Sequence, residues 1–480
     1  MDIYIFGASK LGRYAKNFLE NRYNIVAFCD NNYKKYDIVE GLKVIGVDEL
    51  IQKYKAKRST IVIASMFFDE ISKQLIELEI NKEDINIFNI RMDTYDSMFN
   101  NLILNDEKIR LTNKTNVHLF VDSVHSQRLI EIINKNMDKS SNIFIVYNTT
   151  NPIYVKGNKN GNVFYLNVYN SSMHIFNCIK GCNKLFIHYL DIELAKFLNK
   201  YKIWNYVDKI YWGVFGGDLY PYTNIELYEK QTAKYVAVNT VPSSADKKYM
   251  QLVIKNIDFV LTSRECEYEI IKSNFNTEAE MIKFTYPLSI NLKDLDNISN
   301  EKRIKMSDIL GVEKVILLGN SATAENNHIE MINRLQQIDN GKFAIVCPLS
   351  YGCNNYAKQI IDYGKKVFSE RFLPVTEFLD TKKYFELIQS VDIVIMNHIR
   401  QQAGANISAA IYFGKKVFLN SKSIFFKHFQ SSCIRIFESD KISSYEVMIK
   451  KNEYRDANII KFKEIYDEQK IKDKILMLLK

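Results

Sequence analysis

A turn rich in small polar residues follows an apolar, strand-like run at residues 315–318. Backbone N–H groups of such a turn, and the positive end of the helix expected after it, favour phosphate oxygens. Serine, threonine and asparagine are also ordinary helix caps, so a capped turn without a ligand is the alternative. The candidate phosphate-binding residues of this turn are Gly319, Asn320, Ser321, Asn327 and His328.

Two more polar loops follow strand-like runs in the same part of the chain. Pro348, Ser350 and Tyr351 come after the run 343–347, and the two hydroxyls suit a sugar or a base. The run 392–396 leads into a loop with an arginine, two glutamines and a glycine. A guanidinium beside amide donors suits a diphosphate, and a surface turn is the alternative. The residues of this loop are Arg400, Gln401, Gln402 and Gly404.

Acidic and imidazole groups in the middle of the chain are candidates for proton transfer. Asp218 lies in a Gly-Gly-Asp turn after a strand-like run, and a carboxylate held there can act as a general base. Asp122 and His125 follow the run 117–121, where an imidazole can accept a hydroxyl proton near neutral pH. Glu377 can hold a ribose or sugar hydroxyl. For each of these residues, an ordinary structural position in a turn or at a helix start is the alternative.

The start of the chain has a glycine turn between two apolar runs, residues 2–6 and 25–28, with an acidic residue after the second run. This order is typical of a nucleotide-binding βαβ unit, although the spacing G-x4-G is not the full dinucleotide fingerprint. A nucleotide or nucleotide-sugar site is one interpretation, and a docking module without a ligand is the other. The candidate residues are Gly7, Ser9, Gly12 and Asp30.

We expect no metal and no cofactor. The only D-x-D spacing that could hold a sugar-nucleotide metal, at Asp294 and Asp296, lies in a polar stretch and not at a strand end. Without a metal, Arg400 and helix dipoles would neutralise a leaving diphosphate. The seven cysteines are irregularly spaced, so we expect free thiols in a reducing compartment.

These candidate residues need strands and helices that place them at sheet edges. Apolar runs alternate with helical patterns along the chain, which predicts an α/β fold. We expect a Rossmann-like domain at residues 1–95, a connector at 92–114, and two consecutive doubly wound domains at 115–300 and 305–440, an arrangement called GT-B. Strands are expected at 185–188, 209–211, 235–238 and 259–262, and the polar stretch 294–308 is expected to separate the two doubly wound domains. Residues 441–480 read as amphipathic helices, which either pack on the domains or lie on a membrane.

Composition narrows the classes of partner. The 480 residues are 47% hydrophobic, with 17 glycines and 6 prolines, which excludes disorder for most of the chain and a collagen-like structure. The net charge of +9 is spread out, so nucleic acid is not an expected partner, while an anionic membrane surface or a phosphate-bearing substrate fits. No apolar run approaches the roughly 20 residues of a membrane span, and residues 1–4 start no signal peptide. A cytoplasmic protein is therefore expected.

Several motifs in one order resemble a known enzyme family over residues 115–430. They are W-G-x-x-G-x-D-L-Y at 212–220, G-N-S followed by N-x-H-I at 319–329, Pro348 to Tyr351, and an approximate R-Q-Q-G at 400–404. The pattern is similar to that of the TDP-N-acetylfucosamine:lipid II N-acetylfucosaminyltransferases. The chain departs from this pattern in three places: it has an additional first domain, it has Ala403 between Gln402 and Gly404, and the sequence of its turn after Ser321 differs. Residues 1–95, with F-G-A-S and D-N-N, resemble Rossmann-like domains attached to bacterial surface-polysaccharide enzymes.

The resemblance implies transfer of an amino-deoxysugar from a dTDP-sugar to a polyprenyl-diphosphate-linked saccharide, by a peripheral protein at the inner face of the membrane. The loops around Gly319 and Arg400 would hold the donor, and Asp218 or His125 would be the base, with inversion at the sugar carbon. Two alternatives remain. One is a CDP-polyol phosphotransferase of wall-polymer synthesis, and the other is a non-catalytic nucleotide-sugar-binding scaffold.

Overall fold

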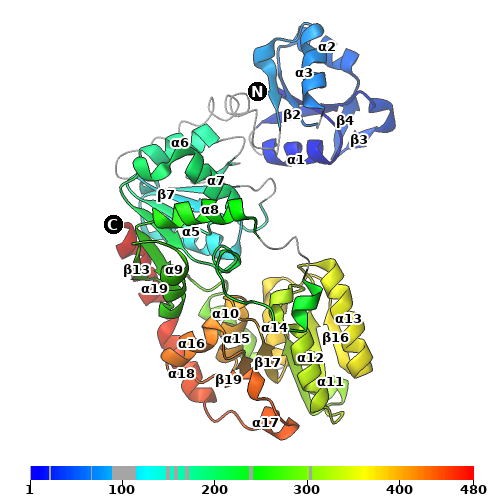
Figure 1. Ribbon diagram of the computed structural model, residues 1–480. Coiled ribbons are helices and arrows are strands. Elements are labelled where there is room, and N and C mark those ends of the chain that lie inside the picture. Colours follow the sequence, from blue (N-terminus) through cyan, green and yellow to red (C-terminus); the bar gives the residue numbers. More distant parts are fainter. Residues whose placement is uncertain are drawn as a thin grey trace. The chain divides into compact units, whose positions relative to one another are not determined.

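A computed structural model describes residues 2–20, 23–65, 67–88, 115–147, 152–155, 161–166, 168, 172–236, 242–301 and 305–480. This part of the chain is α/β and contains sheets of six, seven and six strands (Figure 1). The chain divides into two compact units, Met1–His188 with Glu193–Tyr211, and Tyr189–Ile192 with Trp212–Lys480. The expected connector 92–114 lies outside the described residues.

The first sheet has the strand order β3-β4-β2-β1-β5-β6. Its central strands are rich in β-branched and aromatic residues and are mostly buried, as parallel strands between helices must be. Apart from the antiparallel pair β3–β4, the neighbouring strands are parallel, and they follow the order of a doubly wound sheet. The strands are β1 Asp2–Phe6, β2 Asn24–Cys29, β3 Ile38–Val39, β4 Leu42–Ile45, β5 Thr60–Ile63 and β6 Ile85–Ile87, and the helices are α1 Lys10–Leu19, α2 Val47–Ala56 and α3 Phe68–Glu77.

The second sheet has the order β13-β12-β11-β10-β7-β8-β9. The strands predicted at 185–188, 209–211 and 259–262 are confirmed. The strand predicted at 235–238 is wrong where the structure describes it, because Tyr235 ends a 3₁₀ helix, Thr232–Tyr235. The strands are β7 Asn116–Phe120, β8 Asn142–Tyr147, β9 Val163–Leu166, β10 Leu185–His188, β11 Ile210–Gly213, β12 Phe259–Thr262 and β13 Glu280–Lys283. The helices are α5 Val124–Asn136, α6 Ser172–Lys180, α7 Ile192–Tyr201, α8 Ser244–Lys255 and α9 Glu265–Asn274.

The third sheet has the order β16-β15-β14-β17-β18-β19, with every neighbouring pair parallel. Its strands are β14 Lys314–Leu318, β15 Phe343–Pro348, β16 Phe372–Val375, β17 Ile393–Met396, β18 Lys416–Leu419 and β19 Phe437–Glu438. The chain passes from β14 to β15 on one side and places β17 on the other. The carboxyl ends of β14 and β17 therefore form a topological switch point, where open parallel sheets bind their ligands.

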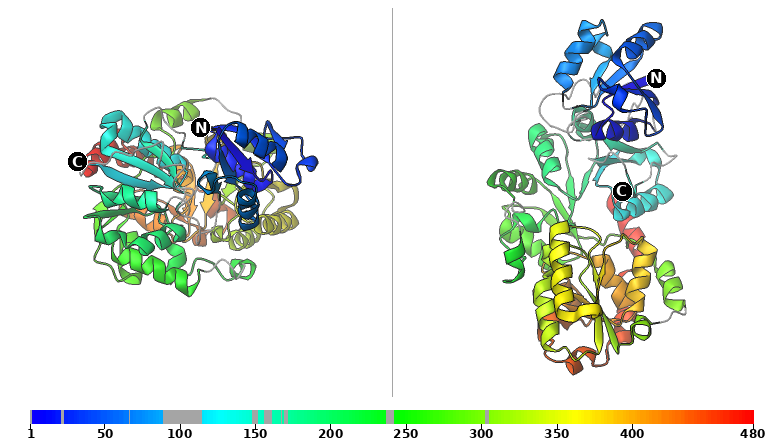
Figure 2. Two further views of the ribbon diagram at one scale, coloured as in Figure 1. Left: turned by 90° about the horizontal axis from the view of Figure 1, so that it is seen from above. Right: turned by 90° about the vertical axis from the view of Figure 1, so that its right-hand side faces the viewer.

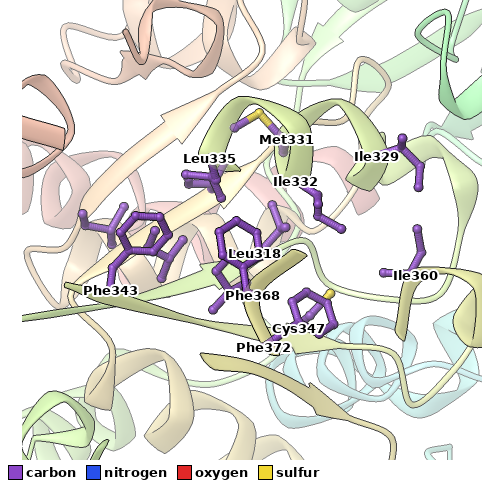
Figure 3. Close-up of a cluster of buried hydrophobic side chains, with 14 of the residues drawn as sticks. Leu318, Ile329, Met331, Ile332, Leu335, Phe343, Cys347, Ile360, Phe368 and Phe372 are labelled. Carbon is purple, nitrogen blue, oxygen red and sulfur yellow. The ribbon is translucent and has the colours of Figure 1, made fainter. Parts of the chain in front are cut away.

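Helices α12 His328–Gln337 and α13 Asn354–Phe368 lie side by side over one face of this sheet (Figure 2). Side chains from both helices meet strand residues such as Leu318, Phe343 and Cys347 in a dry cluster (Figure 3). Burial of each large apolar side chain contributes about 2 kcal/mol. This packing fixes where β14 ends and α12 begins, and with them the loop between the two. The remaining helices of this region are α14 Thr381–Ser390, α15 Gly404–Tyr412, α16 Ile424–Ser431 and α17 Tyr445–Ile449.

The polar stretch 294–308 lies between β13 and β14 in the sequence and is helical over most of its described residues. It contains most of α10, Leu292–Asn300, which buries Leu295 and Ile298, and part of α11, Met306–Leu310. The expected C-terminal helices are α18 Arg455–Ile465 and α19 Glu468–Leu479, and their residues Phe462, Ile475 and Leu479 are buried. Part of their apolar stripe therefore packs on the protein, whereas Ile460 is exposed. Within the described residues, no helix has the length and hydropathy needed to cross a bilayer.

Candidate active site

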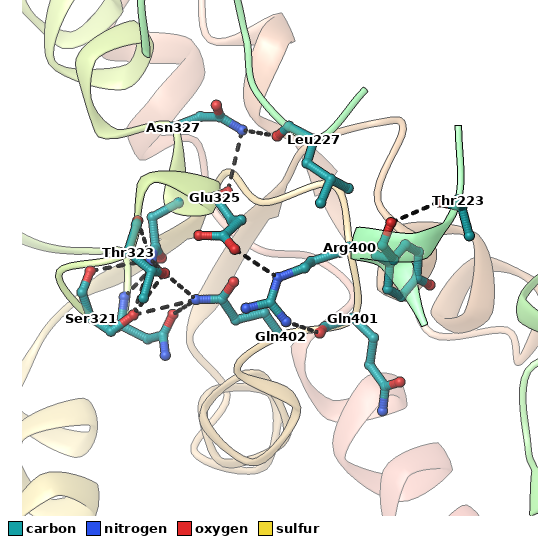
Figure 4. A network of polar contacts seen from close by, with 12 residues as sticks. Thr223, Leu227, Ser321, Thr323, Glu325, Asn327, Arg400, Gln401 and Gln402 are labelled. Atoms are coloured by element: carbon teal, nitrogen blue, oxygen red, sulfur yellow. Dashed lines mark hydrogen bonds and ion pairs between the residues drawn. The ribbon is translucent and has the colours of Figure 1, made fainter. Parts of the chain in front are cut away.

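The loops after β14 and β17 meet through one glutamine. The Nε2 atom of Gln402 lies 3.0 Å from Oδ1 of Asn320, 3.0 Å from Oγ1 of Thr323 and 3.3 Å from Oγ of Ser321 (Figure 4). An amide –NH₂ has two hydrogens, so these acceptors share them. Residues that are about 80 positions apart in the sequence are thus held together at the switch point of the third sheet.

The loop after β15 joins the same network. Asn320 donates from Nδ2 to the hydroxyl of Tyr351 at 2.7 Å. The predicted Gly319, Arg400 and Tyr351 loops therefore come together at one edge of the sheet. Pro348 ends β15, and the neighbouring Ser350 is half-buried.

Asn326 holds the first of these loops in shape. Its Oδ1 accepts from the backbone N–H of Asn320 at 3.1 Å, and its Nδ2 lies within 3.2 Å of oxygens of Ser321 and Thr323. Our sequence analysis missed this residue. The Asn-Asn pair before the helix was the available signal, because asparagine side chains commonly bond nearby backbone in turns.

Arg400 is held by an acid from the opposite loop. Its Nε lies 3.5 Å from Oε1 of Glu325, and its Nη1 donates to the carbonyl of Gln401 at 3.2 Å (Figure 4). Both charged side chains are mostly buried. Glu325 was not among the predicted site residues. Its carboxylate holds the guanidinium at the switch point and can also accept a hydrogen bond from a sugar hydroxyl.

Buried polar atoms without a hydrogen-bond partner are concentrated on these loops. Among the described residues they include Oε1 of Gln401, Oε1 of Gln402 and Nε2 of His328, and Nε of Arg400, which has the ion pair with Glu325 but no hydrogen bond. Buried polar groups in folded proteins are nearly always hydrogen-bonded, so each exception needs an explanation. Four of them on two adjoining loops indicate a surface prepared for a polar ligand.

His328, the first residue of α12, is an uncharged member of the site. Its Nδ1 lies 3.2 Å from the hydroxyl of Tyr356, and complete burial lowers the pKa of the imidazole to about 3. The ring is therefore neutral at physiological pH and offers a hydrogen bond, not a charge. Gly319 has a φ of 70°, and a Cβ built there would lie 2.4 Å from Nε2 of His328. A side chain at 319 would fill the space in front of the imidazole.

A cleft of about 1190 Å³ opens beside these loops. One wall comes from residues of the first loop and of the start of α13, including Thr323, Glu325 and Tyr356. The other wall is the segment 220–236 with residues 242 and 247, which brings Lys230, Lys234 and Lys247 to the cleft. Its volume is sufficient for a nucleotide sugar, and its lysines favour anionic groups.

The segment that forms this second wall is tied to the start of α12, and we call residues 225–235 the strap. Oε1 of Glu330 accepts from the backbone N–H groups of Gln231 and Thr232 at 2.6 and 2.9 Å, and its Oε2 accepts from the Thr232 hydroxyl. Asn327, with a left-handed φ of 50°, accepts from the N–H of Glu229 at 2.9 Å and donates to the carbonyl of Leu227 at 3.1 Å. The wall of the cleft is thus fixed by side chains at the N-terminus of α12.

Asp218 is buried and fully engaged. Its carboxylate accepts from Nε1 of Trp212 at 2.9 Å and from the N–H groups of Phe215 and Leu190 at 3.0 and 3.1 Å. Burial raises the pKa of this carboxyl to about 6. The bonds hold the Gly-Gly-Asp turn, and a Cβ at Gly216 of this turn would lie 2.6 Å from the carbonyl oxygen of Gln401. Asp218 thus shapes a turn that lies directly against the Arg400 loop.

The other predicted bases belong to the first compact unit. The Asp122 carboxylate accepts from the N–H groups of Ile153 and Val155 at 2.6 and 2.7 Å and from that of Tyr154 at 3.2 Å. It therefore holds this segment at the end of β7. His125 lies half-buried in the first turn of α5.

The remaining candidates lie at the edge of the third sheet. Glu377 is exposed in the loop after β16. Gly404 begins α15, where a Cβ would lie 2.8 Å from Phe425, so a glycine is needed there for packing.

The predicted glycine turn of the first sheet is present, but the acidic residue expected to contact a ligand, Asp30, instead accepts a hydrogen bond from the turn. Oδ2 of Asp30 accepts from the N–H of Ala8 at 3.0 Å. A Cβ at Gly7 would lie 2.4 Å from the carbonyl oxygen of Ala64, and one at Gly12 would lie 1.8 Å from that of Gly7. Ser9 is exposed before α1. These glycines are explained by close packing of the chain.

Residues 281–471 match a family model described as 4-alpha-L-fucosyltransferase, glycosyl transferase group 56. Residues 1–86 match a model described as C2185-like, N-terminal. The chain is a glycosyltransferase. The family match covers the end of the second sheet, the whole third sheet and the loops around Gly319 and Arg400.

Solved structures share the fold of this glycosyltransferase. The alpha,alpha-trehalose 6-phosphate synthase of Burkholderia multivorans is 8% identical, with a TM-score of 0.51, over 77% of this chain and 96% of its own. An E. coli structure described as trehalose-6-phosphate bound with UDP-2-fluoro glucose is 8% identical, with a TM-score of 0.52, over 76% of this chain and 98% of its own. The UDP-forming alpha,alpha-trehalose-phosphate synthase of Burkholderia vietnamiensis is 8% identical, with a TM-score of 0.52, over 76% of this chain and 99% of its own. The expected GT-B fold is confirmed.

Proposed function

We propose that this glycosyltransferase moves an amino-deoxysugar, N-acetylfucosamine-like, from a dTDP-sugar to a polyprenyl-diphosphate-linked saccharide of a bacterial surface polysaccharide. The observation that carries the proposal is the group of buried polar atoms without a hydrogen bond on the Gly319 and Arg400 loops, at the switch point of the third sheet. The fucosyltransferase-type family match supports the sugar class. The motif order around Trp212, Gly319 and Arg400 supports the donor and the acceptor.

In this proposal the donor diphosphate binds between the two loops. Arg400 supplies a full positive charge, and the N-termini of α12 and α15 supply partial ones. Gln401 and Gln402, with the neutral His328, direct hydrogen bonds to the nucleotide sugar. Ser350, Tyr351 and Glu377 flank its sugar or base. Positive charge aimed at the leaving diphosphate lowers the barrier to transfer because negative charge develops there.

The acceptor enters the cleft beside these loops. Lys230, Lys234 and Lys247 on its wall suit the diphosphate of a polyprenyl-linked saccharide. An acceptor with a lipid tail requires the enzyme to work at the inner face of the cell membrane as a peripheral protein. Asp218 and His125 are the candidates for the base on the acceptor hydroxyl. Asp218, with a pKa raised to about 6, is ionised at neutral pH, and in the structure its carboxylate is buried and bonded to the Gly-Gly-Asp turn.

Ligand-induced thermal stabilisation tests the donor site. Wild type, Arg400→Ala and the exposed-arginine control Arg435→Ala are heated with dTDP, UDP, GDP or CDP. A ligand that binds only the folded protein raises the unfolding midpoint. We expect a dTDP or UDP shift in wild type and Arg435→Ala that is lost in Arg400→Ala. A shift that survives in Arg400→Ala contradicts the assignment, and a shift with CDP alone favours the polyol-phosphate alternative.

Turnover separates an enzyme from a scaffold. We expect sugar transfer to a polyprenyl-diphosphate-linked saccharide by wild type and Arg435→Ala, and a loss of at least 100-fold in kcat/KM in Arg400→Ala, or about 3 kcal/mol in the transition state. Nucleotide binding without any transfer to a lipid-linked saccharide supports the scaffold alternative.

A further inference from the structure

A second cavity, of about 600 Å³, shares no lining residue with the first cleft and contains none of the proposed donor-loop residues. Its walls come from the starts of α9 and α19, from α16 and from the end of α18. Ser263 directly follows β12, and Thr285 lies two residues after β13. The cavity is therefore at the carboxyl ends of two parallel strands, the edge at which doubly wound sheets bind ligands.

The lining of this cavity has an excess of positive charge. Five lysines face it with three glutamates: Lys283, Lys427, Lys461, Lys470 and Lys474 with Glu265, Glu269 and Glu464. Two lysines are paired, Lys461 with Glu464 at 2.8 Å and Lys283 with Glu265 at 3.5 Å. Within the described part of the chain, the other three lysines have no carboxylate within 4.0 Å. Three cations and one carboxylate remain around one small volume.

Neutral groups that hydrogen-bond phosphate complete the lining. Ser263, Thr285 and Ser432, which carry hydroxyls, and His428, which carries an imidazole, are among the residues that line the cavity. Burial, with the charges of Arg264 and Lys283, lowers the pKa of His428 to about 3, so this ring is neutral. The positive potential that disfavours a proton on His428 favours an anion in the same place. Hydroxyls, an imidazole and ammonium groups around one volume are the donor set that phosphate oxygens require.

We propose that this cavity is a second anion site, which binds the phosphate group of a ligand other than the sugar donor. The ligand carries its phosphate either on a membrane phospholipid, as the headgroup, or on a small soluble phosphate ester. The C-terminal helices contribute three of the five lysines, while Phe462, Ile475 and Leu479 of the same helices are buried. In this proposal, Lys461 of α18 and Lys470 and Lys474 of α19 contact the ligand.

Charge reversal tests the site against a matched control. The double variant Lys427→Glu/Lys474→Glu removes two of the lysines without a carboxylate partner. The control Lys358→Glu/Lys366→Glu makes the same charge change on exposed lysines of α13 that line neither cavity. Binding is measured at one ionic strength to vesicles with phosphatidylglycerol, to neutral phosphatidylcholine vesicles, and to glycerol 1-phosphate.

We expect wild type and the control to bind one of the phosphate probes, and the Lys427→Glu/Lys474→Glu variant to bind it at least tenfold more weakly. Binding to phosphatidylglycerol vesicles alone identifies a headgroup, whereas binding to glycerol 1-phosphate identifies a soluble ester. Equal weakening in the control, or no binding of wild type to either probe, overturns the proposal. Arg400→Ala must leave this binding unchanged, so the outcome is separate from that of the donor site.

Discussion

Several side chains of the candidate site have structural roles that their residue types alone do not predict. Gln402 spans two loops, Asn326 folds one of them, and Glu325 holds Arg400. His328 is a neutral hydrogen-bonding group because it is buried. At the residue scale, the site is an amide-rich network with one guanidinium, and the atoms left unpaired in it are those available to a ligand.

Asp218 allows a prediction on the pH dependence of stability. Its pKa is raised from 3.8 to about 6 in the folded protein. Between these values the folded protein holds a proton that the unfolded chain releases, so the free energy of unfolding falls as pH rises and levels off above about 6. We expect Asp218→Asn to lose this fall. Urea unfolding at pH 4 to 8 measures it, with the exposed Asp362→Asn as the control. An unchanged slope in Asp218→Asn contradicts the assigned pKa shift.

Much of the site could be predicted from types and spacing. Gly319, Asn320, Ser321, Tyr351, Arg400 and Gln402 each follow a strand-like run, and parallel strands bring their carboxyl ends to one edge. Asn326, Glu325 and Glu330 were missed because their roles depend on partners that sequence order does not reveal. Asp218 was predicted from a turn that the structure confirms, but only the structure shows that Leu190, from a separate segment, joins Trp212 and Phe215 in donating to its carboxylate.

At the scale of elements, the strap 225–235 ends in a 3₁₀ helix, Thr232–Tyr235, at the residue where the wrong strand prediction begins. The backbone N–H groups of Gln231 and Thr232, just before that prediction, bond the side chain of Glu330, about 100 residues away. A contact with a residue so distant in the sequence could not be predicted from a short apolar run. Central strands such as β14 and β17 were predicted correctly because continuous runs of buried β-branched residues fit little else.

Removal of the Glu330 side chain should loosen the strap. We expect Glu330→Ala to speed hydrogen exchange at Gln231 and Thr232 at least tenfold and to raise the KM for the acceptor, since the strap is a wall of the cleft. Donor-induced stabilisation should persist, because the Arg400 loop keeps its contacts. Mass spectrometry of the exchanged amides makes the measurement, with the exposed Glu370→Ala as the control. Unchanged exchange at these two amides would refute the role of Glu330.

The whole molecule joins a first sheet, residues 2–88, to a GT-B fold. The first sheet has the strand order of nucleotide-binding domains, but its glycines serve close packing and its Asp30 bonds the turn. Its fold could be predicted from the alternation of apolar runs and helices. Whether this domain binds a ligand could not be predicted, because the same glycine turn occurs both where a ligand binds and where the chain is only closely packed.

A packing defect in the first sheet should leave donor binding intact. Gly7→Ala places a Cβ 2.4 Å from the carbonyl oxygen of Ala64, whereas Gly41→Ala, also at positive φ, meets nothing within 4 Å. We expect Gly7→Ala to cost about 2–4 kcal/mol of stability and Gly41→Ala about 1. The dTDP-induced rise of the last unfolding transition should stay at its wild-type size in both. Its loss in Gly7→Ala alone would put the nucleotide site in the first sheet.

The bonds between the strap and α12 have a kinetic consequence. Asn327 and Glu330 fix a wall of the acceptor cleft, and they stand one residue before and two residues after His328, which faces the donor loop. A donor bound beside His328 would hold this helix start further and, through Asn327 and Glu330, the wall of the cleft against which the second substrate binds. Steady-state transfer should follow a compulsory order, in which the nucleotide sugar binds first and the nucleotide leaves last.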